Sequence, residues 1–294
     1  MPLGKTFHNL SNNKEQKKYA MTNLGSITLI PYAGLCNRMR AISSAIYVSI
    51  HHNVPLKIIW NKSHNCAAHF TDLFYPIDIQ GVTFKENEQF LHKLHRKGID
   101  SLIIKPILKL KYDQVVYDFN SDALGDITNF INKEGNSLIK TCYAIGTYYD
   151  YNKIFRPIEH IDIHIKQLTS LFSSNTIGVH VRRTDHTISI KESSDDSFFR
   201  LMDSELATHP QTNFYLATDD DNVKRKMEEK YGNKIITTHN TPLCRNSVEG
   251  MQHAVVDLYC LSRTRKLIGS YGSSYSGVAA EIGKINLMIP RHNS

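Results

Sequence analysis

Two arginines, a threonine and an aspartate occupy positions 182 to 185, directly after an apolar run. That run, Ile177–Val181, alternates apolar and other residues and predicts a short buried strand. Ligands of open α/β sheets bind just beyond the carboxyl ends of the strands. A guanidinium presents a planar fork of donors that fits phosphate oxygens in pairs. The pattern favours an anion site at Arg182 and Arg183, with solvated arginines, one paired to Asp185, as the ordinary alternative.

Two later strand ends carry polar residues as well. Thr218 and three aspartates follow the apolar run 213–217 and open a charged helix at 221–231. Asp219 or Asp220 as helix N-cap explains most of this pattern, and Thr218 and Asp219 stay candidates for ligand contact.

A glycine- and serine-rich loop at 270–277 separates a strand from a helix. Its small residues would let backbone N–H groups approach phosphate oxygens; the candidates are Ser270, Gly272, Ser273 and Ser274.

Asp257 lies on the helix predicted at 247–262, on one stripe with Ala254 and Leu261. It is therefore not expected to be freely solvated. Its carboxylate could accept hydrogen bonds from the N–H edge of a guanine. The structural alternative is an ion pair with Arg38 or Arg182.

The turn between the first predicted strand and the first predicted helix contains further candidates. Residues 26–30 predict a strand, residues 37–52 a helix and residues 55–60 a second strand. Between the first two, Gly34, Asn37 and Arg38 stand at a helix N-terminus, where N–H groups and the helix dipole suit an anion. The turn lacks the GxGxxG spacing of a dinucleotide site. A plain tight turn with Arg38 on the surface explains it equally well.

Two further clusters have ordinary explanations. His92 and His95 have the spacing of a metal pair, but no third ligand stands nearby, so we interpret them as solvated. A tyrosine cluster lies beside Gly146 and is typical either of a sugar site or of packing at a domain edge; its members are Tyr143, Tyr148, Tyr149 and Tyr151.

From residue 176 onward, strands and helices alternate cleanly, which predicts βαβ units and a parallel sheet. We expect strands at 176–181, 213–217, 234–237, 266–269 and 285–289, with helices between them at 196–208, 221–231, 247–262 and 276–282. With the βαβ opening, this predicts an α/β protein of two Rossmann-like domains facing a cleft. We divide it into a polar leader (1–24), an N-terminal domain (25–156) and a C-terminal domain (157–294).

Composition narrows the class of partner. The 294 residues are 41% hydrophobic and 21% charged, typical of a globular protein, and the net charge of +7 favours an anionic ligand. Basic residues are not interleaved with aromatics at a nucleic-acid-binding spacing. Five scattered cysteines argue against a disulfide framework and a zinc site, and for a reducing compartment. No apolar stretch has transmembrane length and the leader lacks a secretion signal, so we expect a cytoplasmic protein.

Three ordered segments together resemble the motifs of the α1,6-fucosyltransferases, the family of the nodulation and core enzymes, related to the protein O-fucosyltransferases. They are His180–Asp185, Tyr215–Asp220, and Val255–Ser262 with Ser270–Ser274. The resemblance covers about residues 176–284. In the N-terminal half, Gly34–Arg38 alone is similar to the glycine turn of these enzymes.

This resemblance implies a GT-B-like fold and an inverting, metal-independent transfer of fucose from GDP-fucose, without a cofactor. Carried over by position, Arg182 would bind the β-phosphate and stabilise the departing GDP, while His180 and Asp257 would contact the guanosine. Ser273 and Ser274 would lie by the diphosphate. Arg183 and Asp185 would support the site.

The resemblance leaves the general base open. Where the animal enzymes place a glutamate, this chain has Ile190, and His186 replaces their lysine. The candidates are Glu192, His186 and Asp185, in that order. The acceptor is equally open: an oligosaccharide, a lipid-linked glycan or a glycoprotein. Peripheral contact with the inner face of a membrane is also left open. Alternatives are another donor, such as GDP-mannose or a UDP-sugar, and a non-catalytic sugar-nucleotide- or glycan-binding protein.

Overall fold

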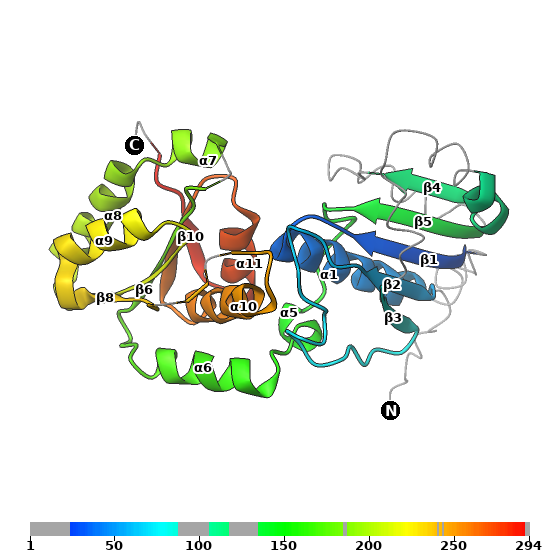
Figure 1. Ribbon diagram of the computed structural model, residues 1–294, viewed down its shortest axis with the longest axis horizontal. Helices are drawn as coiled ribbons and strands as arrows, with labels where there is room; N and C mark the ends of the chain where they lie inside the picture. Colours follow the sequence, from blue (N-terminus) through cyan, green and yellow to red (C-terminus); the bar gives the residue numbers. More distant parts are fainter. Residues whose placement is uncertain are drawn as a thin grey trace, which may run out of the picture.

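The structure is a computed structural model that describes residues 24–87, 106–117, 135–184, 187–239, 241–242 and 244–291. Two α/β domains lie side by side, each built on one parallel sheet (Figure 1). The predicted α/β, GT-B-like architecture of two Rossmann-like domains is thereby confirmed.

The N-terminal sheet has the strand order β3-β2-β1-β5-β4, and all neighbouring strands are parallel. β1 lies at its centre, and the chain leaves β1 directly into α1. The strands are β1 (Leu24–Pro31), β2 (Leu56–Trp60), β3 (Val82–Glu86), β4 (Gln114–Tyr117) and β5 (Gly135–Thr141).

The C-terminal sheet has the order β10-β9-β6-β7-β8 and is also parallel. The chain winds from β6 to one edge and then returns to the other side of β6, so β6 and β9 flank the topological switch point. Ligands of such sheets bind beyond the strand ends at this point. The strands are β6 (Ile177–Val181), β7 (Phe214–Thr218), β8 (Ile235–Ile236), β9 (Lys266–Gly269) and β10 (Asn286–Met288).

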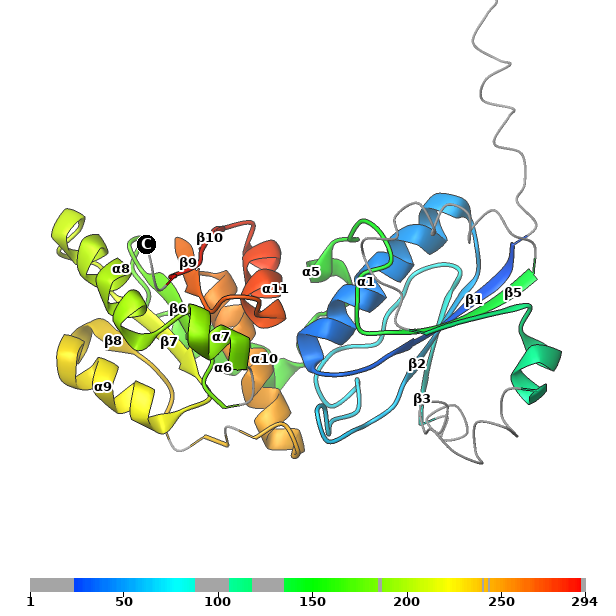
Figure 2. The same cartoon turned by 90° about the horizontal axis from the view of Figure 1, so that it is seen from above.

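The longest described helix is α1 (Leu35–His52), whose apolar stripe of Met39, Ile42 and Ile46 is fully buried. It is followed by the C-cap residue Asn53, which takes the left-handed conformation common after a helix C-terminus. Seen from above, α1 lies against α11 of the other domain (Figure 2). The other helices are α5 (Tyr151–Ile154), α6 (Glu159–Thr169), α7 (Thr187–Glu192), α8 (Asp195–Thr208), α9 (Asp221–Tyr231), α10 (Val248–Ser262) and α11 (Ser274–Gly283).

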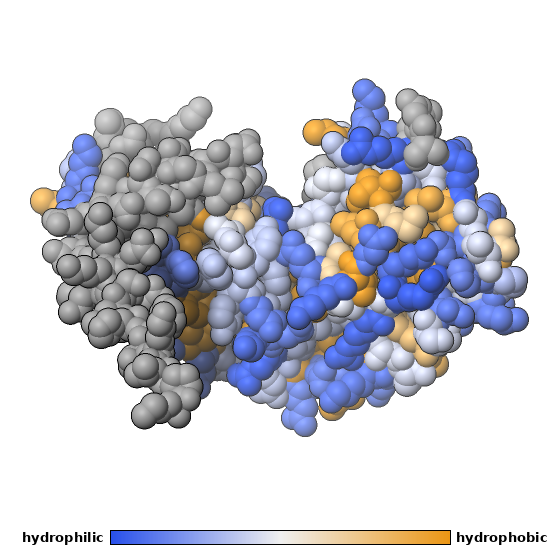
Figure 3. Space-filling model, turned by 180° about the vertical axis from the view of Figure 1, so that it is seen from behind, coloured by the Kyte–Doolittle hydropathy of each residue, from blue (hydrophilic) through white to orange (hydrophobic). Residues whose placement is uncertain are grey.

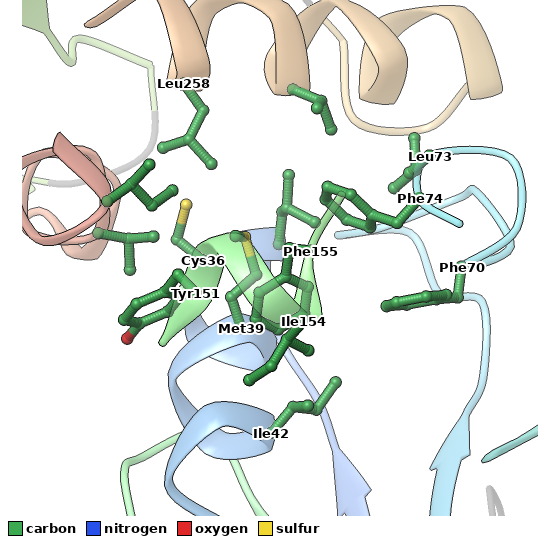
Figure 4. Close-up of a cluster of buried hydrophobic side chains, with 14 of the residues drawn as sticks. Cys36, Met39, Ile42, Phe70, Leu73, Phe74, Tyr151, Ile154, Phe155 and Leu258 are labelled. Atoms are coloured by element: carbon green, nitrogen blue, oxygen red, sulfur yellow. The ribbon is translucent and has the colours of Figure 1, made fainter. Parts of the chain in front are cut away.

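One hydrophobic cluster runs across the domain boundary, and we call it the shared core. Figure 4 shows its central part, where α1 contributes Cys36 and Met39, α5 and the residue after it contribute Ile154 and Phe155, and α10 contributes Leu258. All five side chains are at most 5% exposed. The domains are therefore joined by packed apolar surface as well as by the chain itself. Ile42, Phe70, Leu73, Phe74 and Tyr151 are also labelled in this view.

Most predicted elements are confirmed to within one or two residues at each end. Among the elements that were not predicted are the strand β3, the four-residue helix α5 and the short helix α7. β3 is an edge strand with no fully buried residue, so its apolar pattern is weak. α5 and α7 are shorter than two helical turns, too short to show a periodic stripe.

The surface agrees with the composition. Seen from behind, the coloured surface is largely hydrophilic, with a compact hydrophobic patch on the C-terminal domain (Figure 3). No helix among the described residues is long and apolar enough to span a membrane. All five cysteines are free thiols.

Candidate functional site

A cavity of about 310 Å³ lies between the two domains, in the size range of small-ligand pockets. The start of α1 forms one wall. The other wall is formed by the carboxyl ends of β6 and β7, by α10 and by the loop that leads into α11. Of the residues singled out in the sequence, the cavity lining brings together Gly34, Asn37, His180, Arg182, Thr218, Asp219, Asp257, Gly272, Ser273 and Ser274.

Ser270 ties the ends of β6 and β9 together and does not line the cavity. Its hydroxyl donates to the His180 carbonyl at 3.1 Å and accepts from the Arg182 backbone N–H at 2.9 Å. The side chain is fully buried. Ser270 thus holds the backbone of the β6 end in place, instead of contacting a ligand itself.

His180, on β6, is an uncharged ring at neutral pH. Its Nδ1 lies 2.7 Å from the Ser276 hydroxyl, and its ring lies against Tyr275 at 4.7 Å between centroids. Burial, reinforced by the Arg182 charge, lowers the pKa of His180 to about 3. A neutral imidazole in the cavity wall suits contact with an uncharged part of a ligand.

The two arginines of the motif point to different places. Arg182 lines the cavity, and its Nη1 is 3.9 Å from the Asp219 carboxylate. Arg183 turns away: its Nε and Nη2 both donate to Asp195 at 2.9 and 2.8 Å, and its guanidinium lies over Phe198. Arg182 is thus the motif arginine that faces the cavity, and Arg183 braces the start of α8.

Asp219 fastens the loop after β6. Its Oδ1 accepts from the Arg183 N–H at 2.7 Å, and its Oδ2 accepts from the Thr184 hydroxyl at 2.6 Å. The N-cap of α9 is Asp220, whose Oδ1 accepts from two backbone N–H groups. Of the two cap candidates, Asp220 therefore caps the helix, and Asp219 stabilises the loop that carries Arg182.

Two helix N-termini converge on the cavity from opposite domains. α1 begins after Gly34, and α11 begins after Ser273, whose side chain makes no capping bond in the described structure. Neither first turn contains an acidic residue. Because the first N–H groups of a helix lack intrahelical partners and carry the positive end of the dipole, both walls can bind an anion.

Glycine has different roles in the two loops. Gly272 has φ 64°, a left-handed conformation that glycine adopts without strain. In the first turn the left-handed residue is Ala33, at φ 65°, while Gly34 has an ordinary φ of −72°. The backbone angle of Gly34 therefore does not require a glycine at this position.

Arg38, a sequence candidate for anion binding, does not line the cavity. It is 1% exposed, and its guanidinium donates to the carbonyls of Ala33 and Asn61 and to the Ser63 hydroxyl at 2.7–2.8 Å. It also lies over the Trp60 ring at 4.7 Å. The guanidinium fastens the first turn and β2, so the structure places Arg38 in the scaffold of the N-terminal domain.

Asp257 lines the cavity, but neither suggested arginine is its partner. Its Oδ1 accepts from the Tyr215 hydroxyl at 2.6 Å, and its Oδ2 lies 3.3 Å from His253 Nε2. Burial raises the pKa of the Asp257 carboxyl, partly opposed by His253 and Tyr215. The carboxyl group is thus held in one orientation at the cavity wall.

Several lining residues were not found from the sequence. Arg40 of α1 faces the cavity with its Nη2 donating to Asn37 Oδ1 at 2.7 Å. Arg245, on the loop before α10, lies close to Gly34, and its carbonyl accepts from Ala67 N–H across the domains. Arg40 could have been found from the sequence, because it lies three residues after Asn37 and therefore on the same face of the helix. The loop that carries Arg245 has no periodic pattern that could have indicated it. Further lining residues of this kind are Leu35, Cys36, Ala217, Pro242, Cys244, Gly250, Met251, His253, Ala254 and Tyr275.

The base candidates gain no support from this geometry. Glu192 ends α7 and is not among the lining residues, and Asp185 and His186 lie outside the described residues. His92 and His95 also lie outside them. No group of three potential metal ligands occurs among the residues that the structure describes.

In the tyrosine cluster, Tyr151 packs into the shared core and Tyr148 contacts it at 5.6 Å between ring centroids. Tyr148 also hydrogen-bonds Arg40, which lines the cavity. Packing at the domain boundary therefore accounts for this pair, as one of the two alternatives expected.

Comparison with known proteins places the fold among fucosyltransferases. No family model matches the sequence, and no curated protein matches it. Among solved structures, the NodZ α-1,6-fucosyltransferase soaked with GDP-fucose has a TM-score of 0.60 at 17% identity, covering 88% of this chain and 92% of NodZ. A variant of Arabidopsis thaliana FUT1 in complex with GDP has a TM-score of 0.61 at 15% identity, covering 90% and 70%. POFUT1 in complex with GDP has a TM-score of 0.52 at 10% identity, covering 91% and 98%. The chain thus shares the two-domain GT-B fold of these fucosyltransferases.

Proposed function

We propose that this protein is an inverting, metal-independent glycosyltransferase that moves fucose from GDP-fucose to a glycan acceptor. The observation that carries the proposal is the position of Arg182, beyond the β6 end at the switch point, in a cavity that two helix N-termini also face. The fold, shared with fucosyltransferases that bind GDP or GDP-fucose, supports it.

The negative charge of the leaving diphosphate explains why positive groups line the cavity. Breaking the bond between fucose and phosphate builds negative charge on the diphosphate. Arg182, the first N–H groups of α11 and the serines at its start provide a fixed set of donors for that charge. Donors that are already oriented lower the energy of the transition state without reorganising during the reaction.

The Asp257 carboxylate indicates which nucleobase the donor carries. Asp257 would repel phosphate, so it suits the uncharged end of the donor. Guanine presents two neighbouring N–H donors on one edge, which match the two oxygens of a carboxylate. Uracil flanks its single N–H with carbonyl oxygens, which a carboxylate repels. Asp257 and the neutral His180 therefore favour a guanine nucleotide.

The acceptor side is the less determined half of the proposal. In an inverting transfer, an acceptor hydroxyl attacks the sugar from the face opposite the diphosphate. The proton would pass to Glu192, His186 or Asp185, in the order that the sequence suggests. The acceptor is proposed to be an oligosaccharide, a lipid-linked glycan or a glycoprotein.

Nucleotide binding tests the donor. GDP at 100 times its dissociation constant should stabilise the protein by about 2.7 kcal/mol, which raises the melting temperature by about 5 °C. UDP at the same concentration should change it little. The measurement is a thermal-shift panel of GDP and UDP, with hydrolysis of GDP-fucose and GDP-mannose followed alongside. Stabilisation by UDP and not by GDP would mean a different donor, and GDP binding without turnover of either sugar would mean a non-catalytic binding protein.

Chelation tests the role of metal. Because a guanidinium and helix N-termini already supply positive charge to the diphosphate, transfer from GDP-fucose in excess EDTA should stay within about twofold of the untreated rate. The rate is measured with and without added Mn²⁺ or Mg²⁺. Activity that disappears in EDTA and returns with either metal would contradict metal independence.

A further inference from the structure

Asp257 belongs to a buried polar network behind the cavity wall. His253 Nε2 lies 3.3 Å from its Oδ2 and 3.1 Å from the hydroxyls of both Thr238 and Thr241. Tyr215, fully buried, donates to Oδ1 at 2.6 Å. Each carboxylate oxygen therefore has a polar group of the protein within 3.3 Å.

His253 is held beside the carboxylate by partners of its own. Its Nε2 forms hydrogen bonds with the hydroxyls of Thr238 and Thr241. Because the same nitrogen lies 3.3 Å from Asp257 Oδ2, the imidazole is fixed next to the carboxylate.

Without polar partners, the free energy of ionising the buried Asp257 carboxyl group would be high. Burial disfavours the charged form of a carboxyl group, and hydrogen bonds to the charged form oppose that effect. Burial is the largest influence on the Asp257 pKa and raises it. The groups that face Asp257 come from every element packed around it: His253 and Cys260 on α10, Tyr215 on β7, Lys224 on α9, His164 on α6 and Tyr275 on α11.

We propose that His253 and Tyr215 are positioning residues that keep Asp257 ionised and oriented for a guanine, so that base selectivity depends on the Tyr215 hydrogen bond and on the contact with His253. The inference rests on the proposed GDP-fucose donor. A carboxylate accepts from both N1–H and the 2-amino group of guanine. A protonated carboxyl loses one of these acceptors. Selectivity for the 2-amino group should therefore weaken as the pH falls through the Asp257 pKa.

Inosine diphosphate is the appropriate probe, because it has the phosphates of GDP and lacks the 2-amino group. The ratio of GDP to IDP affinity cancels the protonation of the phosphate. By calorimetry the native protein should prefer GDP by on the order of tenfold at pH 7.5, the loss expected for one hydrogen bond to a charged group. The ratio should fall toward one on acidification.

Two variants separate positioning from packing. Tyr215→Phe removes the hydrogen bond to Oδ1 and His253→Leu removes the polar group beside Oδ2. Both should therefore reduce the ratio to about twofold at pH 7.5 and move its pH midpoint upward. His253→Gln keeps an N–H donor and should retain most of the selectivity. His239→Leu, at an exposed histidine paired with Glu228, is the control and should change neither quantity.

The outcomes distinguish this inference from the function beneath it. Native protein that binds neither GDP nor IDP would overturn the proposed donor and this inference with it. Native protein that prefers GDP, beside folded Tyr215→Phe and His253→Leu proteins with an unchanged ratio and pH midpoint, would leave the donor standing and overturn the positioning role.

Discussion

Replacing Arg182 by alanine should lower turnover of GDP-fucose by about 10²–10³-fold, the usual loss when one oriented donor of a transition-state site is removed. Charge on the diphosphate grows as the fucosyl bond breaks, so the contribution of the guanidinium grows toward the transition state. Arg182→Lys should recover little of the rate, because an ammonium cannot replace a bidentate fork. Turnover is measured at saturating donor, alongside the melting temperature.

The fold should survive these changes. The contact from Arg182 to Ser270 is made by its backbone N–H and is kept in every variant. We therefore expect a change in melting temperature of less than about 2 °C, corresponding to under 1 kcal/mol. Arg225→Lys, at an exposed arginine of α9, serves as the control for an arginine-to-lysine change. Near-normal turnover in Arg182→Lys would mean that the phosphate is not held by the fork.

Arg38→Ala should have the opposite profile, with a large loss of stability. The change leaves two carbonyls and a hydroxyl without their donor and opens a void beside Trp60. Hydrogen bonds to a charged group contribute about 1.5–3 kcal/mol each, not additively. We expect the free energy of unfolding to fall by about 3 kcal/mol, measured by chemical denaturation.

Arg40→Ala is the matched comparison, two residues further along α1. Arg40 is partly exposed and lines the cavity, so its removal should cost less than about 1 kcal/mol. If Arg38→Ala kept full stability and instead bound GDP more weakly, the sequence-based assignment of Arg38 to the ligand would be right and its scaffold role wrong.

The fold was predictable because the periodicity of apolar residues and the alternation of strands and helices along the chain can both be read from local sequence. The alternation of strands and helices after residue 176 predicts a parallel sheet, and a parallel sheet brings its strand ends to one edge. His180, Arg182 and the loop at 270–274 could thus be assigned to one site from the sequence. Their convergence required no knowledge of side-chain conformation.

Side-chain direction was not predictable, because it depends on residues distant in the chain. Arg182 and Arg183 are adjacent and chemically identical, yet Asp195 and Phe198 turn the second away from the cavity. Arg38 is buried and bonded to Asn61 and Ser63, whereas Arg40, two residues further along α1, is partly exposed. Asp257 is paired with Tyr215 through packing between β7 and α10, which no sequence spacing reveals.

The shared core also limits how the two domains of this protein could be exchanged. Glycosyltransferases with two Rossmann-like domains invite chimeras in which one half is exchanged to change the acceptor. Here Phe155 lies in the connecting segment and packs with side chains of both halves, and the Tyr259 hydroxyl of α10 donates to its carbonyl. A splice in this segment would separate groups that pack as one unit. A working chimera would have to carry α5, α6 and the facing surfaces of α1 and α10 from the same parent.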